Sequence, residues 1–359
     1  MSWLLAFLGF VVLIVLHEGG HFAAAKAVGM RVERFSLFFG RPLVSFRRGE
    51  TEYGIGPIPL GGYVRITGMN PREEFSDDVA VRAYYRQPVW KRVVVISAGP
   101  AVNIVLAFLI LWGLLLVNGQ AVMTQRVSSQ RLEQPAAGYL HPGDRIVSVD
   151  GVGGPFDAIV RQIASHRCAG RAVDGCVATT PAHVVVVRDG RRLAFDIRPR
   201  YDATRGIERT RLGFTYAAGT RSLGPAQAAS LSVTTMWDVT TATVSRIAKL
   251  FNAHDRKQLS GTVGAYEITR ESFSYSLTQA LGILALISLS LAIINLFPFL
   301  PLDGGHIFWA LAEKVRGRAI PFSVMEAASA VGIVLVVMLA VVGFSNDISR
   351  LQHGGFNVR

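Results

Sequence analysis

The chain has 359 residues and a net charge of +12; 50% of its residues are apolar and 17% are charged. This composition excludes a mainly disordered chain, and the mean hydropathy of +0.36 is too high for an ordinary soluble domain. The two cysteines, Cys168 and Cys176, exclude a disulfide scaffold but leave a single disulfide open, and a basic excess spread along the chain argues against a nucleic-acid partner.

Apolar segments predict a polytopic α-helical membrane protein with four transmembrane helices. Each segment approaches the ~20 apolar residues that a helix needs to cross a bilayer. The segments are residues 1–28, 93–117, 280–305 and 325–344. A further stretch at about 229–251, within residues 201–279, carries charges and repeats its apolar residues at helical spacing. This pattern is typical of an amphipathic helix on a surface rather than of a span.

Basic residues predict the orientation of these spans. No lysine or arginine precedes the first apolar run, whereas Lys26, Arg31 and Arg34 follow it. The positive-inside rule therefore predicts that residues 29–92 are cytoplasmic and that the N-terminus lies outside, which is the reverse of a secretory signal. Carried along the chain, the same path places residues 118–279 and the C-terminus outside the cytoplasm.

The first span contains His17-Glu18-Gly19-Gly20-His21, which reads HExxH. Two histidines four residues apart lie one above the other on a helix, so both can bind one Zn²⁺, and the adjacent glutamate can take a proton from the attacking water. The alternative is a chance motif in a polar helix end. However, two imidazoles and a carboxyl group in an apolar span cost free energy and normally mark a functional site.

Residues 51–69 are predicted to form a β-hairpin. Apolar and polar residues alternate in two short runs with Gly61 and Gly62 between them. Farther along, the small residues and Asn103 at the start of the second span are typical of close helix packing in membranes. We expect them to pack around the site rather than to take part in its chemistry.

Residues 122–200 resemble one PDZ module, an α+β fold inserted between the second and third spans. Two Asp-Gly turns, Asp150-Gly151 and Asp189-Gly190, each follow an apolar run of the kind that forms a strand. PDZ modules bind peptides by strand addition. The segment before the first strand departs from the usual PDZ pattern here, so the module either binds peptide or screens substrates by size.

A third zinc ligand is expected at the end of the third span, where Pro298 and Pro301 break the helix. HExxH supplies two protein ligands and a catalytic zinc usually has three, so Asp303 is the best candidate, with His306 as a further ligand or neighbouring donor. By its helical rise, His17 lies about 21 Å below the outer interface of the membrane. It therefore shares the cytoplasmic half of the bilayer with Asp303.

The two motifs resemble those of the bacterial site-2 proteases, in the branch similar to the regulator of sigma-E protease, and the resemblance covers nearly the whole chain. It implies that His17, His21 and Asp303 bind Zn²⁺ and that Glu18 is the catalytic general base. The substrate-binding residues that it implies are Asn295, Gly61, Gly62, Tyr63 and Val64. The hairpin would enter the membrane and hold an unwound substrate by strand addition; an ordinary cytoplasmic hairpin is the alternative.

The resemblance also implies where the protein acts and on what. It implies an intramembrane zinc endopeptidase of the bacterial inner membrane, with its active site toward the cytoplasm and its PDZ-like module outside. Its partners would be the lipid bilayer, transmembrane substrates such as anti-sigma factors that have already lost their outer part, and an upstream site-1 protease. The alternative is a catalytically silent membrane PDZ adaptor, which would hold no zinc.

Overall fold

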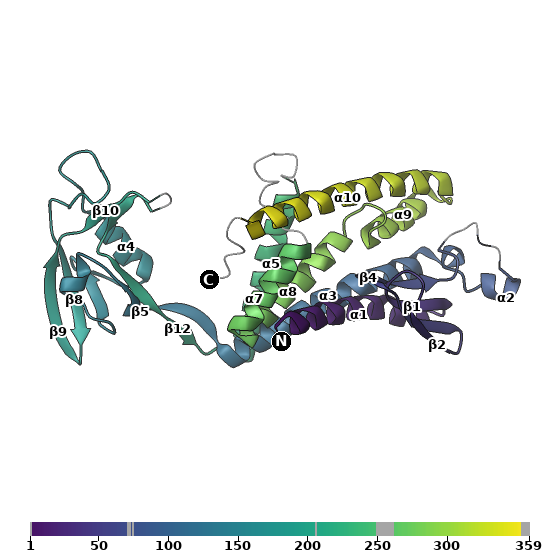
Figure 1. The fold of residues 1–359 in the computed structure, drawn as a ribbon, viewed down its shortest axis with the longest axis horizontal. Helices are drawn as coiled ribbons and strands as arrows, with labels where there is room; N and C mark the ends of the chain where they lie inside the picture. The colour runs from purple at the N-terminus through teal and green to yellow at the C-terminus, as the bar shows by residue number, and fades with distance from the viewer. Residues whose placement is uncertain (1, 70–72, 74, 205–206, 249–261, 353–359) are drawn as a thin grey trace. The chain divides into compact units, whose positions relative to one another are not determined.

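The computed structural model describes residues 2–69, 73, 75–204, 207–248 and 262–352 (Figure 1). The chain divides into two compact units, one made of Met1–Val117 with Gly224–Arg359 and the other of Asn118–Leu223. We call the first the helical unit, because it holds the long helices, and the second the β unit, because strands dominate it.

Among the described residues of the helical unit, four helices are long and apolar enough to cross a membrane. They are α1 (Ser2–Ala27), α3 (Val89–Asn118), α8 (Leu277–Asn295) and α10 (Phe322–Gln352). Their exposed faces carry large apolar side chains such as Leu8, Leu109 and Val334, as helices that face lipid do. The predicted number of four helices that could span a membrane is therefore confirmed.

The third span is shorter than predicted, because α8 ends at Asn295 instead of continuing through the Leu-Asp-Gly sequence. Pro298 and Pro301 follow, and proline fixes its own φ angle and lacks the N–H group that a helix interior needs. A separate helix, α9 (Asp303–Arg316), begins directly after them. Asp303 therefore lies in the first turn of α9 rather than on the third span.

The helix α5 (Pro225–Ala248) covers most of the amphipathic helix predicted at 229–251. It begins at a proline, whose φ angle suits the first turn of a helix. Its exposed side chains include Val233 and Trp237. Residues 249–251 of the predicted helix lie outside the described residues.

The sequence does not predict α7 (Thr262–Tyr275), because its mixed polar and apolar residues lack the long apolar run of a span. It packs against α1 and α8. The Tyr266 hydroxyl donates to the backbone oxygen of Trp3 at 3.0 Å. On the other side, the buried carboxylate of Asp347 in α10 accepts a hydrogen bond from the backbone N–H of Gly264 at 2.7 Å. These contacts tie the first and fourth spans to α7.

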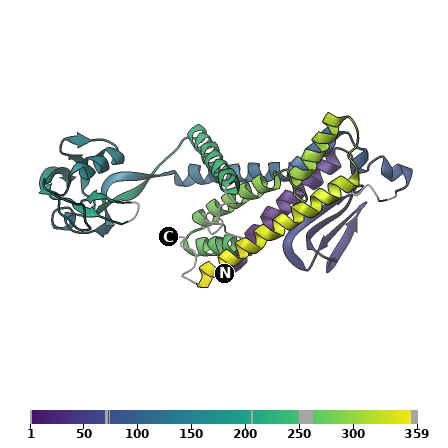
Figure 2. The same ribbon diagram turned by 90° about the horizontal axis from the view of Figure 1, so that it is seen from above.

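A four-stranded sheet packs against α1 in the segment between the first two spans (Figures 1 and 2). Its strands are β1 (Val32–Phe39), β2 (Val44–Arg48), β3 (Thr51–Ile55) and β4 (Ile58–Ile66). The strand order is β2-β3-β1-β4, and the short helices α2 (Asp77–Ala80) and η1 (Tyr84–Arg86) follow. The predicted hairpin over 51–69 is wrong in its pairing, because β1 lies between β3 and β4, parallel to the former and antiparallel to the latter.

Gly61 and Gly62 lie inside β4 and serve close approach instead of chain reversal. A Cβ atom on Gly62 would lie 3.0 Å from the Cγ atom of Glu18, so a bare backbone here lets β4 lie this close to the HExxH helix without displacing a neighbour. The alternation of side chains along a strand does not reveal which neighbour the strand pairs with. The sequence therefore predicts strands here but not their order.

The β unit contains a sheet with the strand order β12-β5-β6-β8-β9, and β7 pairs with β6. Its elements are β5 (Gln120–Leu132), η2 (Ala136–Gly138), β6 (Arg145–Val149), β7 (Val152–Gly153), α4 (Phe156–Ser165), β8 (Ala182–Arg188), β9 (Arg191–Ile197), β10 (Arg200–Asp202), β11 (Arg209–Arg211) and β12 (Phe214–Arg221). This architecture is consistent with the expected PDZ-like module. The boundary predicted at residue 200 is too early, because β12 pairs along β5 and belongs to the same sheet.

Both predicted Asp-Gly turns are present. Asp150 and Gly151 have φ angles of 46° and 79°, and Asp189 and Gly190 have 47° and 78°. Two successive positive φ angles are typical of the type I′ turn, which matches the twist of paired strands. The unit also contains a disulfide between its two cysteines, a pairing that the sequence leaves open.

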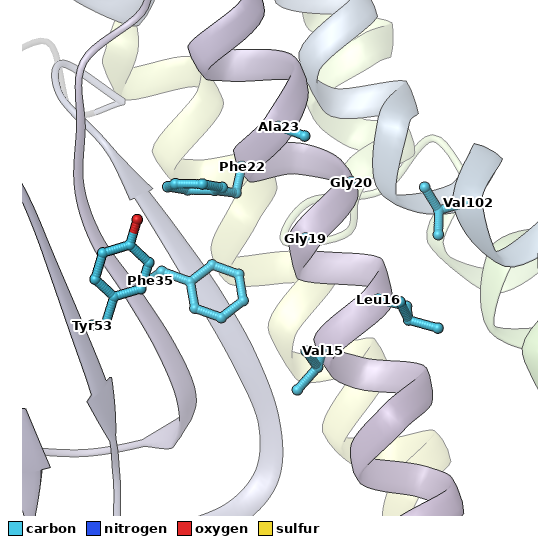
Figure 3. Close-up of a pocket in the computed structure, with 9 residues that line it drawn as sticks. All are labelled: Val15, Leu16, Gly19, Gly20, Phe22, Ala23, Phe35, Tyr53 and Val102. Carbon is cyan, nitrogen blue, oxygen red and sulfur yellow. The ribbon is translucent and has the colours of Figure 1, made fainter. Parts of the chain in front are cut away.

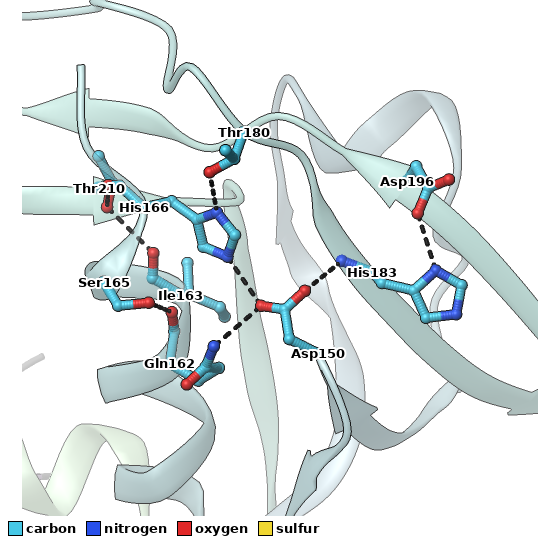
Figure 4. A network of polar contacts seen from close by, with 9 residues as sticks. All are labelled: Asp150, Gln162, Ile163, Ser165, His166, Thr180, His183, Asp196 and Thr210. Atoms are coloured by element: carbon cyan, nitrogen blue, oxygen red, sulfur yellow. Dashed lines mark hydrogen bonds and ion pairs between the residues drawn. The ribbon is translucent and has the colours of Figure 1, made fainter. Parts of the chain in front are cut away.

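The carboxylate of Asp150 joins the β6–β7 turn to its neighbours (Figure 4). It accepts hydrogen bonds from the backbone N–H of His183 at 2.8 Å and from the side chain of Gln162 at 3.0 Å, and it contacts Nε2 of His166 at 2.8 Å. Nδ1 of His166 contacts the Thr180 hydroxyl at 2.9 Å. Burial alone would raise the pKa of Asp150, but the hydrogen bonds from His183, Gln162 and His166 outweigh it and hold that pKa below its ordinary value.

Acidification should weaken the β unit through Asp150. A carboxyl group with a lowered pKa in the folded state stabilises that state above its unfolded pKa of about 3.9, and the stabilisation is lost as the pH falls through the folded pKa. We expect amide hydrogen exchange in β6 and β8, corrected for its intrinsic rate, to accelerate below about pH 4. Asp150→Asn should remove that part of the pH dependence. An unchanged acid response in the variant would assign the effect to other carboxyl groups.

Candidate metal centre

Three potential metal-ligand atoms converge in the helical unit. Nε2 of His17 and Nε2 of His21 lie 3.3 Å apart, and each lies 3.3 Å from Oδ2 of Asp303. A tetrahedral zinc ion bound at ~2.0–2.1 Å separates its ligand atoms by about 3.3–3.4 Å, so all three distances fit Zn²⁺. Oδ2 of Asp303 is buried without a hydrogen-bond partner among the described residues, and a cation would satisfy it.

The sequence around Asp303 explains how a carboxylate from α9 reaches the histidines of α1. The chain turns after α8, and α9 starts against the backbone of that turn. A Cβ atom on Gly304 would collide with the backbone of Leu296 and of Phe297. The glycine after Asp303 is therefore required for this close approach, and it brings the carboxylate back toward α1.

The helix α3 sets the tautomer of His21. Nδ1 of His21 lies 2.9 Å from the backbone oxygen of Val95, which can only accept a hydrogen bond. Nδ1 therefore carries the proton, and Nε2 keeps its lone pair for a metal. A Cβ atom on Gly99 of the same helix would collide with the His21 ring, so α3 can lie here only with a bare backbone at that position.

The buried side chain of Asn103, also in α3, contacts the other candidate histidine ligand, His17. Its amide group lies 3.2 Å from Nδ1 of His17, and its Oδ1 atom is buried without a partner among the described residues. Turning the amide by half a rotation lets Oδ1 accept the proton of Nδ1. The sequence predicts a packing role for Asn103, whereas the structure places it against a candidate ligand. Its position in an otherwise apolar span was the available signal.

An ion pair that the sequence analysis does not identify connects α3 to α9. Both terminal nitrogens of the Arg92 guanidinium donate to the two carboxylate oxygens of Glu313, each at 2.9 Å. Arg92 is buried, so water screens this bidentate pair little. Because Asp303 is the first residue of α9, the pair holds the helix that carries the third candidate ligand.

A cavity of about 670 Å³ lies beside the three ligand atoms. The residues predicted from the sequence all line it: His17, Glu18, His21, Gly61, Gly62, Tyr63, Val64, Asn295 and Asp303. Nδ2 of Asn295 lies 3.3 Å from Nε2 of His17, and the backbone amide of Val64 is among the groups that interact with the Glu18 carboxylate. His306 also lines the cavity but lies outside the group of three ligand atoms.

The zinc content of purified protein should depend on Asp303 and not on Glu18. Asp303→Ala removes one corner of the ligand triangle, and we expect zinc affinity to fall by at least about tenfold. Glu18→Gln removes a carboxylate outside the triangle and should leave one zinc per chain. Elemental analysis of both variants, purified in detergent, provides the measurement. Unchanged zinc in Asp303→Ala would reject this residue as a ligand.

Zinc affinity should also depend on the close approach of the α3 backbone at Gly99 to the His21 ring. In Gly99→Ala the new methyl group displaces the His21 ring, so zinc affinity should fall about 10- to 100-fold. Gly113→Ala is the matched control, because it lies on the same helix and its Cβ atom would have no neighbour within 4 Å. Zinc titration with a competing chelator measures both variants. Equal affinities would show that the His21 ring can move without loss of binding.

Comparison with known proteins agrees with this geometry. Peptidase family M50 matches residues 5–339. The zinc metalloprotease Rip1 of Mycobacterium tuberculosis (strain H37Rv) is 32% identical over 386 residues, which cover 92% of this chain and 93% of the relative. Rip1 of Mycolicibacterium smegmatis is 31% identical over 355 residues, which cover 86% and 85%.

A Campylobacter jejuni protein whose name describes a zinc metalloprotease is 30% identical over 351 residues, which cover 94% of this chain and 91% of the relative. The match to the family and these relatives thus extend over the helices, the candidate ligands and the β unit alike. The chain therefore belongs to peptidase family M50, the site-2 protease family, and is a multi-pass membrane zinc metalloprotease with Zn²⁺ as its cofactor.

Proposed function

We propose that the chain is an intramembrane endopeptidase in which His17, His21 and Asp303 hold the zinc and Glu18 is the general base. The observation that carries this proposal is the convergence of three ligand atoms, 3.3 Å from one another, beside a cavity that Glu18 also lines. Zinc bound there would supply a Lewis acid that polarises the scissile carbonyl and lowers the pKa of water. The protein's own side chains supply the proton transfer and the positioning.

Glu18 is placed to move the proton. It follows the candidate ligand His17 in sequence and lines the same cavity, so its carboxylate can take a proton from the attacking water and return it to the leaving amine.

Asn295 is placed to hold the substrate. Its side-chain amide, 3.3 Å from Nε2 of His17, can donate to the carbonyl oxygen of the scissile peptide.

The strand β4 is placed to receive an unwound substrate. A transmembrane helix hides its amide groups in its own hydrogen bonds, so it must unwind before it can be cleaved. β4 is an edge strand, paired only with β1 in its sheet, and Gly61 to Val64 line the cavity. We propose that the substrate adds to the free edge of β4 and is held there beside Glu18.

The two ends of the sheet differ in chemical polarity, as expected of a sheet that enters the bilayer from the cytoplasmic face. At one end of the β2–β3 pair, Val44 and Ile55 are paired and expose 69% and 48% of their surface. At the other end, Glu50 forms ion pairs with Arg82 and Lys26. Hydrogen bonds from Arg82 and Lys26 lower the pKa of Glu50 to about 2. The apolar end of the β2–β3 pair is suited to the hydrocarbon core of the bilayer, and the charged end is suited to the headgroup interface.

We place the protein in the bacterial inner membrane, with the metal centre toward the cytoplasm and the β unit outside. The substrates would be single-span proteins, such as anti-sigma factors, that an upstream site-1 protease has trimmed. We assign the β unit the fold of a PDZ module that either binds peptide or excludes substrates with a bulky outer domain. The positive-inside distribution of Lys26, Arg31 and Arg34 supports the orientation.

Cleavage of a transmembrane segment tests the proposal. In liposomes that contain a single-span substrate without an outer domain, we expect wild-type protein to cleave within the span and Glu18→Gln to be at least about 100-fold slower, with its zinc retained. Mass spectrometry of membrane fragments from cells with wild-type or Glu18→Gln protein would then identify the native substrate and the cleaved bond.

Two outcomes would contradict the proposal. Full activity in Glu18→Gln would remove the general-base role. Wild-type protein that contains no zinc and cleaves nothing would instead favour the catalytically silent adaptor, in which the PDZ-like β unit carries the function.

A further inference from the structure

A second cavity, of about 460 Å³, lies against α1 (Figure 3). With about 3.6 residues per turn, the lining residues Val15, Gly19 and Ala23 lie on the side of α1 away from His17 and His21. Gly19 and Gly20 of α1 form its floor. Phe35 and Tyr53 of the sheet form one side, and Val102 of α3 forms the other. We call this cavity the outer groove. It lies within the helical unit and is lined almost entirely by hydrocarbon and aromatic carbon.

The floor of the outer groove is open at Gly19, whereas Gly20 packs against the backbone of Ala98 in α3. A Cβ atom on Gly19 would have no neighbour within 4 Å, and Ala23, one turn farther along α1, is exposed. An apolar hollow of this kind is unfavourable next to water and normally marks a binding surface. Beside a helix that crosses the bilayer, the hydrocarbon that reaches it is a lipid acyl chain.

Aromatic rings continue the wall of the outer groove across the sheet. The ring of Phe22 in α1 lies 5.6 Å from that of Phe35 and 5.9 Å from that of Tyr53. The ring of Phe46 in β2 then stacks on that of Tyr53 at 5.2 Å. Tyr53 has the polar tip that is typical of side chains at the boundary between hydrocarbon and headgroups, and the three phenylalanine rings give the wall an apolar surface suited to a lipid chain.

Cationic side chains lie near the C-terminal end of α1, where Nζ of Lys26 lies 5.9 Å from the ring of Phe22 in the wall of the outer groove. Lys26 is in the last turn of α1, and Lys91 at the start of α3 donates to a backbone oxygen at the end of α1 at 3.0 Å. Arg48 is exposed at the same end of β2. The nearby carboxylate of Glu50 is shared between Lys26 and Arg82, so this end keeps an excess of positive charge.

We propose that the outer groove binds an acyl chain of an anionic phospholipid, whose phosphate is held by Lys26, Lys91 and Arg48. This inference rests on the membrane placement proposed for α1, in which these cations lie at the cytoplasmic headgroup level, where anionic lipids attract basic side chains. An apolar helix of a partner protein would fill the hollow but would leave the cations unmatched. The bound chain packs on the reverse face of the helix that carries His17 and His21 and supports its contact with α3.

A photoreactive lipid tests the site on the full-length, zinc-loaded protein. In nanodiscs that contain phosphatidylglycerol with a diazirine in its acyl chain, we expect crosslinks at α1 residues 15–23 and at Tyr53. Ala23→Trp fills the outer groove from an exposed position and should reduce these crosslinks at least fivefold while zinc content stays unchanged. Val334→Trp, at an exposed position on α10, is the matched control and should leave them unchanged. Excess unlabelled phosphatidylglycerol should compete, and phosphatidylcholine should not.

Each of the following results would overturn the lipid-binding proposal. None of them would affect the proposed proteolytic function, because no measurement in this experiment depends on cleavage. Crosslinks spread evenly over the four spans, or unaffected by Ala23→Trp, would mean ordinary annular lipid. Equal competition by phosphatidylcholine would remove the role of the cations. A dimer in native mass spectrometry that Ala23→Trp dissociates would assign the outer groove to a second copy of the chain.

Discussion

The meeting of two imidazole nitrogens with one carboxylate oxygen is the interaction on which the helical unit depends. His17, His21 and Asp303 place three polar atoms 3.3 Å from one another among apolar helices. Without a cation, this arrangement leaves Oδ2 of Asp303 buried and unsatisfied, and burying such a group costs free energy. Zn²⁺ bound between the same three atoms would satisfy all of them. Metal binding and the packing of α1 against the turn after α8 are therefore coupled.

The helix α3 provides no ligand atom, yet it determines how the ligands are held. The Val95 carbonyl and the Asn103 amide contact the outer nitrogens of the two imidazoles, and Gly99 makes room for one of the rings. The ion pair between Arg92 and Glu313 connects the same helix to α9. Contacts of this kind fix the orientation and the basicity of metal ligands, so the second span acts as the scaffold of the metal centre.

The two faces of α1 are specialised differently. The face with the ligands opens into the cavity that Glu18 and the edge strand β4 share, where polar groups and a free strand edge are brought together. The opposite face has glycines, aromatic neighbours and a hollow without polar chemistry. Gly62 and Gly99 let the sheet and α3 approach this helix closely from two sides. The helix thus separates a reactive, water-accessible space from one suited to hydrocarbon.

Local patterns in the sequence were enough to predict the four apolar helices, the two histidines on one helix face, the Asp-Gly turns and the break at Pro298 and Pro301. It also indicated Asp303, because HExxH supplies only two ligands and the end of the third span falls in the same half of the bilayer as His17. The three-dimensional structure was needed to show that β1 lies between β3 and β4, that β12 completes the sheet of the β unit, and that Asn103 contacts His17. The physical reason is that strand order and contacts between helices join residues far apart in the chain, whereas periodicity reports only which face of an element is buried.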